Sequence, residues 1–340
     1  MFRALVGKLH RLGGWSDLAY KAGYHWSRLR RRYLTPRSRF HCLHYRRRRL
    51  AWRANAPLDY PGVVHLELTD RCNARCAMCP HRRLARPKTD MSWELVREVI
   101  LDWPPGGIDR ADLFFFGEPL LYPRLPEVVA LVKERQPRSF TFITTNGQLL
   151  VPELARELWR AGLDGLAVSY QGDEAPLHEQ IMVGIRNAVV EANIADAERL
   201  RREINPRAVF KINSLIMPET SDRVEAIREK WGEVGITLEL VPAHDEYRIL
   251  DPSRPVKRLR RRPCPQVYDS ATVYAHGEVG FCCSDPDASL SIGNVADRPL
   301  GALWLGGRAR ELRRRQEGGD FSAEPICSEC TLDLLRGPVF

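Results

Sequence analysis

The chain has 340 residues, which is enough for two ordinary domains or for one large α/β domain with an appendage. Hydrophobic residues make up 44% of it and charged residues 28%, and this globular composition excludes a collagen-like or wholly disordered chain. No apolar stretch approaches the ~20 residues that a membrane-spanning helix needs, and no secretory signal is visible, so we expect a cytoplasmic protein.

The basic charge of the chain is concentrated in residues 1–60, where the pattern predicts an N-terminal helical segment. This segment holds 15 Lys and Arg residues against two Asp residues and so carries +13, whereas residues 61–340 sum to −4. Apolar residues recur in it at helical spacing: Phe2, Leu5, Val6, Leu9 and Leu12. Such a pattern suits a helix on a membrane surface, and also a solvated basic arm or a helix packed on the body. Contact with the inner membrane face through residues 1–55 is one hypothesis, while nucleic acid is not the expected partner because the body is not basic.

Residues 61–242 show strands that alternate with helices. Strands are predicted over 63–68, 111–116, 139–144, 166–169, 209–215 and 236–241. Helices are predicted over 92–100, 125–132, 152–161, 176–202 and 221–233, the first with Ser92 as its N-cap. Because hairpin signals are missing between these strands, we expect parallel strands joined by crossovers. The pattern fits both an open doubly wound sheet and a barrel, and it does not decide between them.

The composition changes after this alternating region. Residues 243–263 are rich in Pro and Arg and are predicted to form a linker. Residues 264–340 are predicted to form a small α+β domain, with short strands over 271–275 and 279–281 that flank a His-Gly hairpin signal. A helix is expected over 299–316. A domain this small often depends on a metal.

Eight of the nine cysteines fall into three groups: Cys72, Cys76 and Cys79; Cys264, Cys282 and Cys283; and Cys327 and Cys330. Three thiolates in one loop can converge on a metal centre, and the missing fourth ligand is typical of a reactive site. Cys264, Cys282, Cys327 and Cys330 are enough to close a second site. Iron–sulfur clusters are the favoured interpretation, and two zinc sites are the rival one because zinc accepts the Cx2C spacings equally well.

The sequence resembles the radical S-adenosylmethionine (SAM) superfamily in motifs that follow successive predicted strands. The first motif is Cys72-x3-Cys76-x2-Cys79, which we call the first cysteine loop. The others are Phe116-Gly117-Glu118-Pro119, Thr145-Asn146-Gly147 and Val168-Ser169-Tyr170-Gln171-Gly172. The C-terminal part resembles the shortened "twitch" form of the SPASM domain, from Cys264 to the Cys327/Cys330 pair. The resemblance implies an α/β fold: a partial (β/α)6 TIM-like barrel over about 61–242 with a C-terminal auxiliary-cluster domain.

The resemblance also implies a site. Cys72, Cys76 and Cys79 are expected to hold a [4Fe–4S] cluster at which SAM is reductively cleaved to a 5′-deoxyadenosyl radical. One auxiliary [4Fe–4S] cluster is expected on Cys264, Cys282, Cys327 and Cys330. The candidate SAM-binding residues are Met78, Gly117, Glu118, Pro119, Asn146, Ser169 and Asn213. Three positions depart from the family pattern: Phe116 replaces a frequent Gly, Met78 a frequent aromatic residue, and Gln171 a frequent Asp.

The expected function is an oxidoreductase or epimerase reaction on an unidentified substrate. Auxiliary clusters in related enzymes take an electron in dehydrogenation, whereas some related epimerases return a hydrogen atom from a cysteine, for which Cys283 is the candidate. Cys283 is otherwise a spare thiol or an alternative ligand. We favour a sugar, alcohol or lipid-linked substrate and a reductase partner such as flavodoxin or ferredoxin. The alternatives are a peptide maturase and, in another class, a zinc-containing nucleic-acid-binding protein.

Overall fold

A computed structural model of the chain describes residues 50–51, 53–217, 219–220, 222–242, 263–328 and 330. Most of the predicted N-terminal helical segment, residues 1–49 and 52, and almost all of the predicted linker lie outside these residues. The described residues from 51 onward form one compact unit. In the described part of the chain, no helix is both long enough and apolar enough to cross a membrane.

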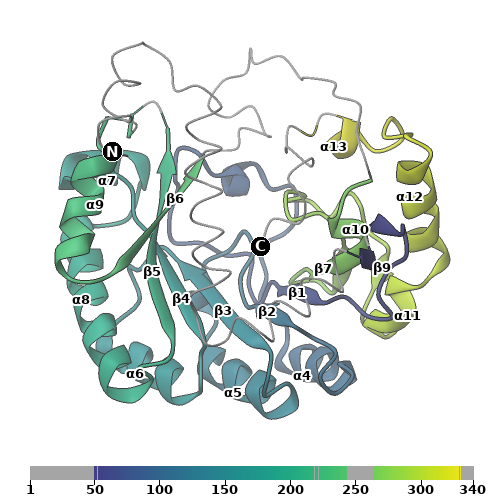
Figure 1. Ribbon diagram of the computed structural model, residues 1–340, viewed down its shortest axis with the longest axis horizontal. Helices are drawn as coiled ribbons and strands as arrows, with labels where there is room; N and C mark the ends of the chain where they lie inside the picture. The colour runs from purple at the N-terminus through teal and green to yellow at the C-terminus, as the bar shows by residue number, and fades with distance from the viewer. Residues whose placement is uncertain are drawn as a thin grey trace. The chain divides into compact units, whose positions relative to one another are not determined.

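The predicted strands form the parallel part of one sheet and follow one another in chain order (Figure 1). They are β1 (Val63–Leu66), β2 (Arg110–Asp112), β3 (Phe140–Thr145), β4 (Gly165–Ser169), β5 (Val209–Ile216) and β6 (Thr237–Pro242). Each strand pairs in parallel with the next. A doubly wound sheet reverses its strand order at a switch point, so this unreversed order identifies the partial barrel. Strand β2 ends four residues earlier than predicted.

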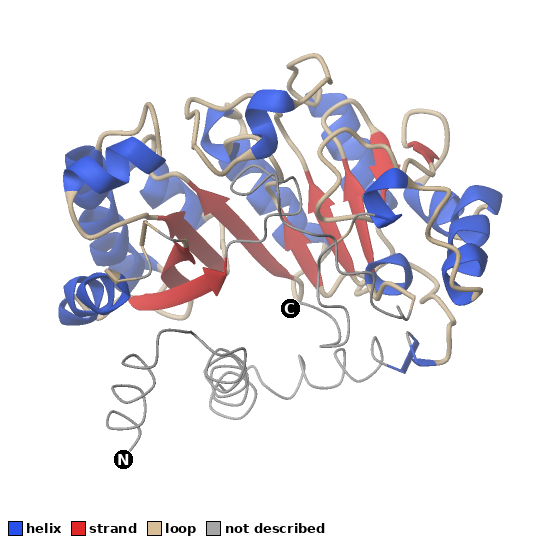
Figure 2. Cartoon of the chain, turned by 90° about the horizontal axis from the view of Figure 1, so that it is seen from above, coloured by secondary structure: helices blue, strands red, loops and turns tan. Residues whose placement is uncertain are grey.

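Helices occupy the outer side of the curved row of strands (Figures 1 and 2). They are α4 (Trp93–Asp102), α5 (Leu125–Arg135), α6 (Pro152–Arg160), α7 (Ala175–Ile181), α8 (Asn187–Ile204) and α9 (Val224–Glu233). The predicted N-cap is confirmed, because the Ser92 side chain accepts a hydrogen bond from the Leu95 amide. The prediction of one helix over 176–202 is wrong. Gly184, at φ +93°, lies between α7 and α8 in the left-handed region and interrupts the helical path.

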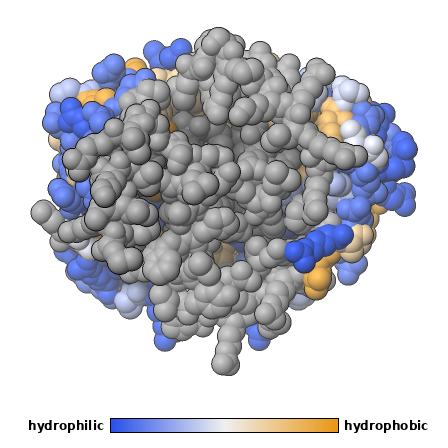
Figure 3. Space-filling view, turned by 45° about the horizontal axis from the view of Figure 1, so that its top comes forward, coloured by the Kyte–Doolittle hydropathy of each residue, from blue (hydrophilic) through white to orange (hydrophobic). Residues whose placement is uncertain are grey.

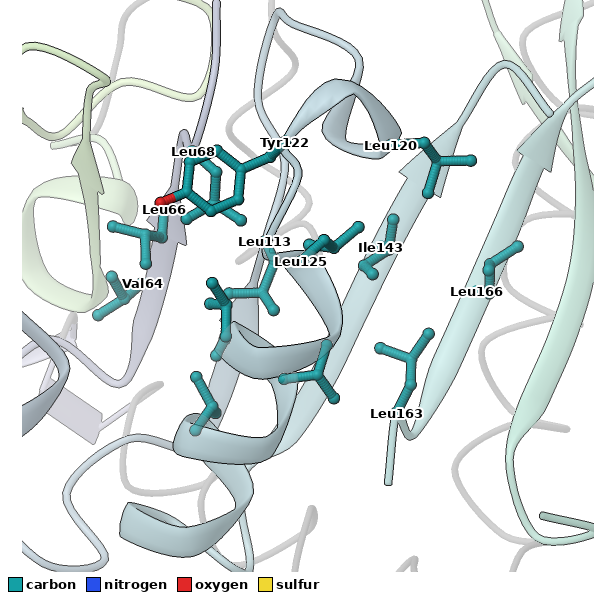
Figure 4. Close-up of a cluster of buried hydrophobic side chains, with 14 of the residues drawn as sticks. Val64, Leu66, Leu68, Leu113, Leu120, Tyr122, Leu125, Ile143, Leu163 and Leu166 are labelled. Carbon is teal, nitrogen blue, oxygen red and sulfur yellow. The ribbon is translucent and has the colours of Figure 1, made fainter. Parts of the chain in front are cut away.

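The core lies between these helices and the sheet. Leu113, Leu125, Ile143 and Leu166 are fully buried there; Leu125 comes from α5, Ile143 and Leu166 from β3 and β4, and Leu113 directly follows β2 (Figure 4). Burial of a side chain of this size contributes about 1.5–3 kcal/mol. The described residues at the margin of the face in Figure 3 are mainly hydrophilic, which fits the outer sides of amphipathic helices.

The C-terminal part extends the same sheet. β7 (Ser270–Val273) pairs in parallel with β1, and β8 (Glu278–Gly280) and β9 (Gly293–Asn294) follow as antiparallel neighbours. The predicted hairpin is thereby confirmed. The helices of this part are α10 (Gln266–Asp269), α11 (Leu300–Trp304), α12 (Gly307–Glu317) and α13 (Pro325–Ser328). The single helix predicted over 299–316 is therefore wrong, since Leu305 and Gly306 separate α11 from α12.

A close backbone contact ties the segment after β2 to the segment after β1. A Cβ atom on Gly117 would lie 2.0 Å from the Thr69 carbonyl oxygen and 2.9 Å from that of Arg71. The next amide, of Glu118, donates to the Arg71 carbonyl at 2.8 Å. Because Arg71 directly precedes the first cysteine loop, only a glycine at position 117 lets these two segments meet.

We expect Gly117→Ala to lower the free energy of unfolding by about 1–3 kcal/mol, because the added methyl group collides with main-chain atoms that cannot rotate away. Anaerobic denaturant titration measures this change. Gly232→Ala is the matched control, since a Cβ at this α9 position meets nothing within 4 Å. The control is expected to leave stability unchanged or to raise it by up to about 1 kcal/mol. Equal stability of the two variants would contradict the close contact.

Candidate functional site

The first cysteine loop starts at the end of the first barrel strand. Cys72, Cys76 and Cys79 are half-buried free thiols in the turns before the 3-10 helix η1 (Pro80–Arg83). The end of α7 and the residues that follow it fix the loop, because the Arg75 amide donates to the Val183 carbonyl at 2.7 Å and the Ala77 amide to the Ile181 carbonyl at 2.9 Å. The loop is thus held from the far side of the barrel as well as by β1.

The three thiols are close enough to influence one another. Burial is the main cause that raises the pKa of Cys72 to about 11 and that of Cys76 to about 12, and the neighbouring thiols of the loop contribute to both shifts. Burial also raises the pKa of Cys79. Positive charge is needed to keep three such thiols ionised, and bound iron supplies it.

This donor set fits a cluster with an open iron. An iron–sulfur cluster is normally held by cysteine thiolates, and this loop offers three of them without a fourth cysteine nearby. Among the described residues, no group of three His, Cys, Asp or Glu side chains stands close enough to hold one metal ion. This agrees with a four-iron cluster, because each of its cysteine ligands binds a different iron atom and the ligands need not converge on one point.

Glu118 is fully buried in the segment that follows β2. Its carboxylate accepts hydrogen bonds from the Thr145 hydroxyl at 2.6 Å, the Asn146 amide at 2.8 Å and the Leu120 amide at 3.1 Å. Burial raises the pKa of Glu118 to about 7, against the effect of these three donors. The carboxylate therefore ties the end of β3 to the Gly-Glu-Pro segment, and Pro119 begins the 3-10 helix η2 (Pro119–Leu121).

Asn146 connects the end of β3 to the first cysteine loop. Its side-chain nitrogen donates to the Asn73 side-chain oxygen at 2.7 Å, between Cys72 and Cys76 in sequence. Met78 is partly buried and packs on the core beside the same loop. Sequence reasoning missed Asn73, because an exposed Asn between two cysteines shows no pattern of its own.

Ser169 is the last residue of β4, and Asn213, in the interior of β5, is paired with it in register. The Asn213 side-chain oxygen is buried and has no hydrogen-bond partner among the described residues. An unsatisfied acceptor beside the end of β4 fits a bound molecule that donates, such as the ribose hydroxyls of SAM. The adjacent Gln171 is buried, and its side-chain oxygen accepts from the Leu215 amide at 2.9 Å, so this departure from the family pattern joins the two strand ends.

A buried ion pair that the sequence did not reveal lies behind the loop. Glu67 is completely buried, and its oxygens accept from the Arg86 guanidinium at 2.8 and 3.1 Å. Glu67 also accepts from the amides of Phe116 at 3.4 Å and Ala275 at 3.2 Å. Arg86 donates in addition to the Pro286 carbonyl at 2.7 Å. One pair thus joins the first cysteine loop, the Gly-Glu-Pro segment and the C-terminal part.

The C-terminal cysteines come together from three elements: Cys264 before α10, Cys282 and Cys283 after β8, Cys327 in α13 and Cys330 after it. Burial raises the pKa of Cys264, and the nearby thiols of Cys330, Cys283 and Cys327 raise it further. Burial, Cys283 and Cys264 likewise raise the pKa of Cys282 well above its usual value. These buried sulfur donors fit a second cluster.

Cys283 lies beside this second group. Its sulfur accepts a hydrogen bond from the Gln266 side-chain nitrogen at 3.5 Å and lies 3.8 Å from the Ser284 hydroxyl. The sulfur of Cys282 accepts instead from the Ser284 amide at 3.3 Å. Five thiols therefore share the auxiliary site, of which the sequence assigns four as ligands.

Comparison with known proteins agrees with this geometry. A model of the radical SAM superfamily matches residues 66–230, and a model of the SPASM family, an iron–sulfur cluster-binding domain, matches residues 264–331. Fe-coproporphyrin III synthase of Methanosarcina barkeri is 26% identical over 341 residues, which cover 82% of this chain and 83% of that protein.

Two solved structures share the fold. BtrN in complex with AdoMet and 2-DOIA matches with a TM-score of 0.57 and 20% identity, over 80% of this chain and 93% of BtrN. Streptococcus suis SuiB bound to its precursor peptide SuiA matches with a TM-score of 0.62 and 14% identity, over 82% of this chain and 70% of SuiB. The alternative of a zinc-containing nucleic-acid-binding protein is accordingly set aside.

The two family models together cover more than half of the chain. The radical SAM model matches the partial barrel, and the SPASM model matches the C-terminal part that extends its sheet. The chain therefore belongs to the radical SAM superfamily and carries a C-terminal SPASM domain, so it is an enzyme that uses SAM, a [4Fe–4S] cluster and an auxiliary iron–sulfur cluster.

Proposed function

We propose that this enzyme dehydrogenates or epimerises a sugar, an alcohol or a lipid-linked substrate. Cys72, Cys76 and Cys79 hold the first cluster in this proposal. SAM lies against Met78, the Gly117-Glu118-Pro119 main chain, Asn146, Ser169 and Asn213. When bound, the cluster and SAM supply a 5′-deoxyadenosyl radical that takes a hydrogen atom from an unactivated C–H bond.

The pairing of β7 with β1 is the observation that carries the proposal. β1 leads into the first cysteine loop, and β7 lies between Cys264 and Cys282 in the chain. The Glu67–Arg86 pair braces the same junction. Two groups of cysteines that flank neighbouring strands of one sheet are well placed to serve one substrate. This supports a direct part for the auxiliary site in the reaction.

The auxiliary site allows two outcomes. In dehydrogenation, the substrate radical loses one electron and one proton, and a cluster on Cys264, Cys282, Cys327 and Cys330 supplies a one-electron acceptor. In epimerisation, the S–H bond of Cys283 breaks as a new C–H bond forms on the substrate. The resulting thiyl radical regains an electron and a proton from a reductase such as flavodoxin or ferredoxin.

Two other substrate classes are alternatives. SuiB shares the fold and was solved with a precursor peptide, which supports a peptide maturase as the second candidate. The name of the M. barkeri relative points to a porphyrin, and that relative matches most of this chain. A substrate panel for this enzyme therefore includes polyols and sugars, peptides and coproporphyrin.

The first test is the metal content and SAM cleavage of the anaerobically purified enzyme. We expect about eight irons per chain from two [4Fe–4S] clusters, and release of 5′-deoxyadenosine after addition of SAM and dithionite. Cys76→Ala should lose about half of the iron and all of the cleavage. Cys327→Ala should lose iron from the auxiliary site alone. Stoichiometric zinc without SAM cleavage would overturn the proposal.

Cys283→Ser separates the two outcomes at the auxiliary site. If Cys283 is the hydrogen donor, the variant keeps its iron and still forms 5′-deoxyadenosine with the substrate, but yields no epimer. Cys282→Ser is the matched control and is expected to lose auxiliary iron. Loss of iron in the Cys283 variant would instead identify Cys283 as a ligand. Unchanged turnover would leave it as a spare thiol and exclude it as the donor.

We also propose that residues 1–55 bring the enzyme to a membrane surface, because the N-terminal segment carries +13 in a chain that is otherwise slightly acidic. Co-sedimentation with liposomes rich in anionic lipid is expected for the full chain and not for a variant that lacks these residues. The binding should weaken as salt rises. Equal sedimentation of both proteins would exclude the membrane proposal.

A further inference from the structure

Gln316 joins two of the proposed auxiliary ligands through one side-chain amide. This residue of α12 is buried. Its oxygen accepts the main-chain amide of Cys264 at 2.8 Å, and its nitrogen lies 3.8 Å from the Cys327 sulfur, within reach of an N–H···S hydrogen bond. The orientation of the amide is determined by chemistry. The Cys264 amide can only donate, so the oxygen faces it and the nitrogen faces the sulfur.

The helix that carries Gln316 is firmly docked. One turn earlier, the buried Arg313 guanidinium donates to the Val267 carbonyl at 2.7 Å and to the Trp304 carbonyl at 2.8 Å. One residue later, Glu317 accepts from the Tyr268 hydroxyl at 2.8 Å. These contacts hold α12 against α10 and α11. The amide of Gln316 is therefore placed before any cluster binds, and its orientation does not depend on a flexible arm.

We propose that Gln316 is a positioning residue of the auxiliary cluster that raises its reduction potential by donating an N–H bond to the Cys327 sulfur. Reduction adds negative charge to a cluster and its sulfur ligands. A donor aimed at a ligand sulfur stabilises the reduced form more than the oxidised one. In the proposed dehydrogenation, this makes the auxiliary site a better electron acceptor. The inference rests on the assignment of Cys264 and Cys327 as ligands in the proposed function.

The test is a redox titration of the reconstituted holoenzyme, followed by electron paramagnetic resonance. SAM changes the signal of the first cluster, so the signal that it leaves unchanged reports the auxiliary one. Gln316→Met removes the donor without adding charge. We expect its auxiliary cluster to show about a tenfold higher oxidised-to-reduced ratio at a fixed potential, which corresponds to a shift of about 59 mV to lower potential. Gln316→Glu keeps the acceptor for Cys264, and the lost donor and the added negative charge should both shift the potential in the same direction.

Gln136→Met is the matched control. Gln136 is also a buried glutamine: its side-chain oxygen accepts from the Gly106 amide, and its nitrogen donates to the Pro104 carbonyl. It is far from either cysteine group in sequence. This variant is expected to lose stability and to leave both potentials unchanged. It therefore separates a loss of packing from a loss of the donor to sulfur.

A full iron content with an unchanged auxiliary potential in both Gln316 variants would overturn the inference. If Gln316→Met loses auxiliary iron, Gln316→Glu decides, because it keeps the contact with Cys264. An equal potential in that variant overturns the inference, because loss of the donor and the added charge both act to lower it. A shift larger than that of Gln266→Glu, which adds the same charge beside Cys283, supports the inference, and an equal shift overturns it. Failure of the ligand assignment is recognised separately, since Cys327→Ala would then keep the auxiliary signal.

Discussion

Glu67 and Arg86 form the ion pair on which the arrangement of the site depends. A buried carboxylate is tolerated only when it is paired and hydrogen-bonded, and here every contact of Glu67 comes from a different segment. Loss of one partner of such a pair costs about 3–5 kcal/mol, because the remaining charge stays buried. The guanidinium also lies over the Tyr274 ring, with its carbon 4.9 Å from the ring centre. The ion pair therefore couples the positions of the first cysteine loop and the C-terminal part, in addition to the pairing of β7 with β1.

The polar side chains of the site are of two kinds: those that are hydrogen-bonded within the protein and those that are left for a ligand. Glu118 and Gln171 direct their side chains to protein amides and hydroxyls, so these residues shape the strand ends. Asn213 keeps a buried oxygen without a partner among the described residues, and this oxygen can meet a ligand. Both kinds of residue lie on or just after neighbouring parallel strands of the sheet. In the proposed function SAM binds beside them, where contacts within the protein already fix the neighbouring turns.

Much of the barrel was predictable from local pattern. Strand and helix alternation, the Ser92 cap and the hairpin after residue 270 depend on residues near one another in the chain. The split between α7 and α8 was not predictable in this way, since it depends on the positive φ of Gly184, whose position beside the first cysteine loop follows from tertiary packing. Sequence analysis did not identify Glu67, Asn73 or Gln316 as site residues, for a related reason. Their roles come from partners that lie far away in sequence or carry no motif.

The position of β7 beside β1 also has a consequence for synthesis on the ribosome. β1 is made early, and the strand that covers its outer edge is made about 200 residues later, roughly 10–40 s at ordinary elongation rates. During that interval the edge of a buried, Val-rich strand has no native neighbour on one side. Exposed edges of this kind recruit strands from other chains. High-level expression therefore favours aggregation of nascent chains, and slower synthesis or a chaperone that covers exposed strands should raise the yield of folded enzyme.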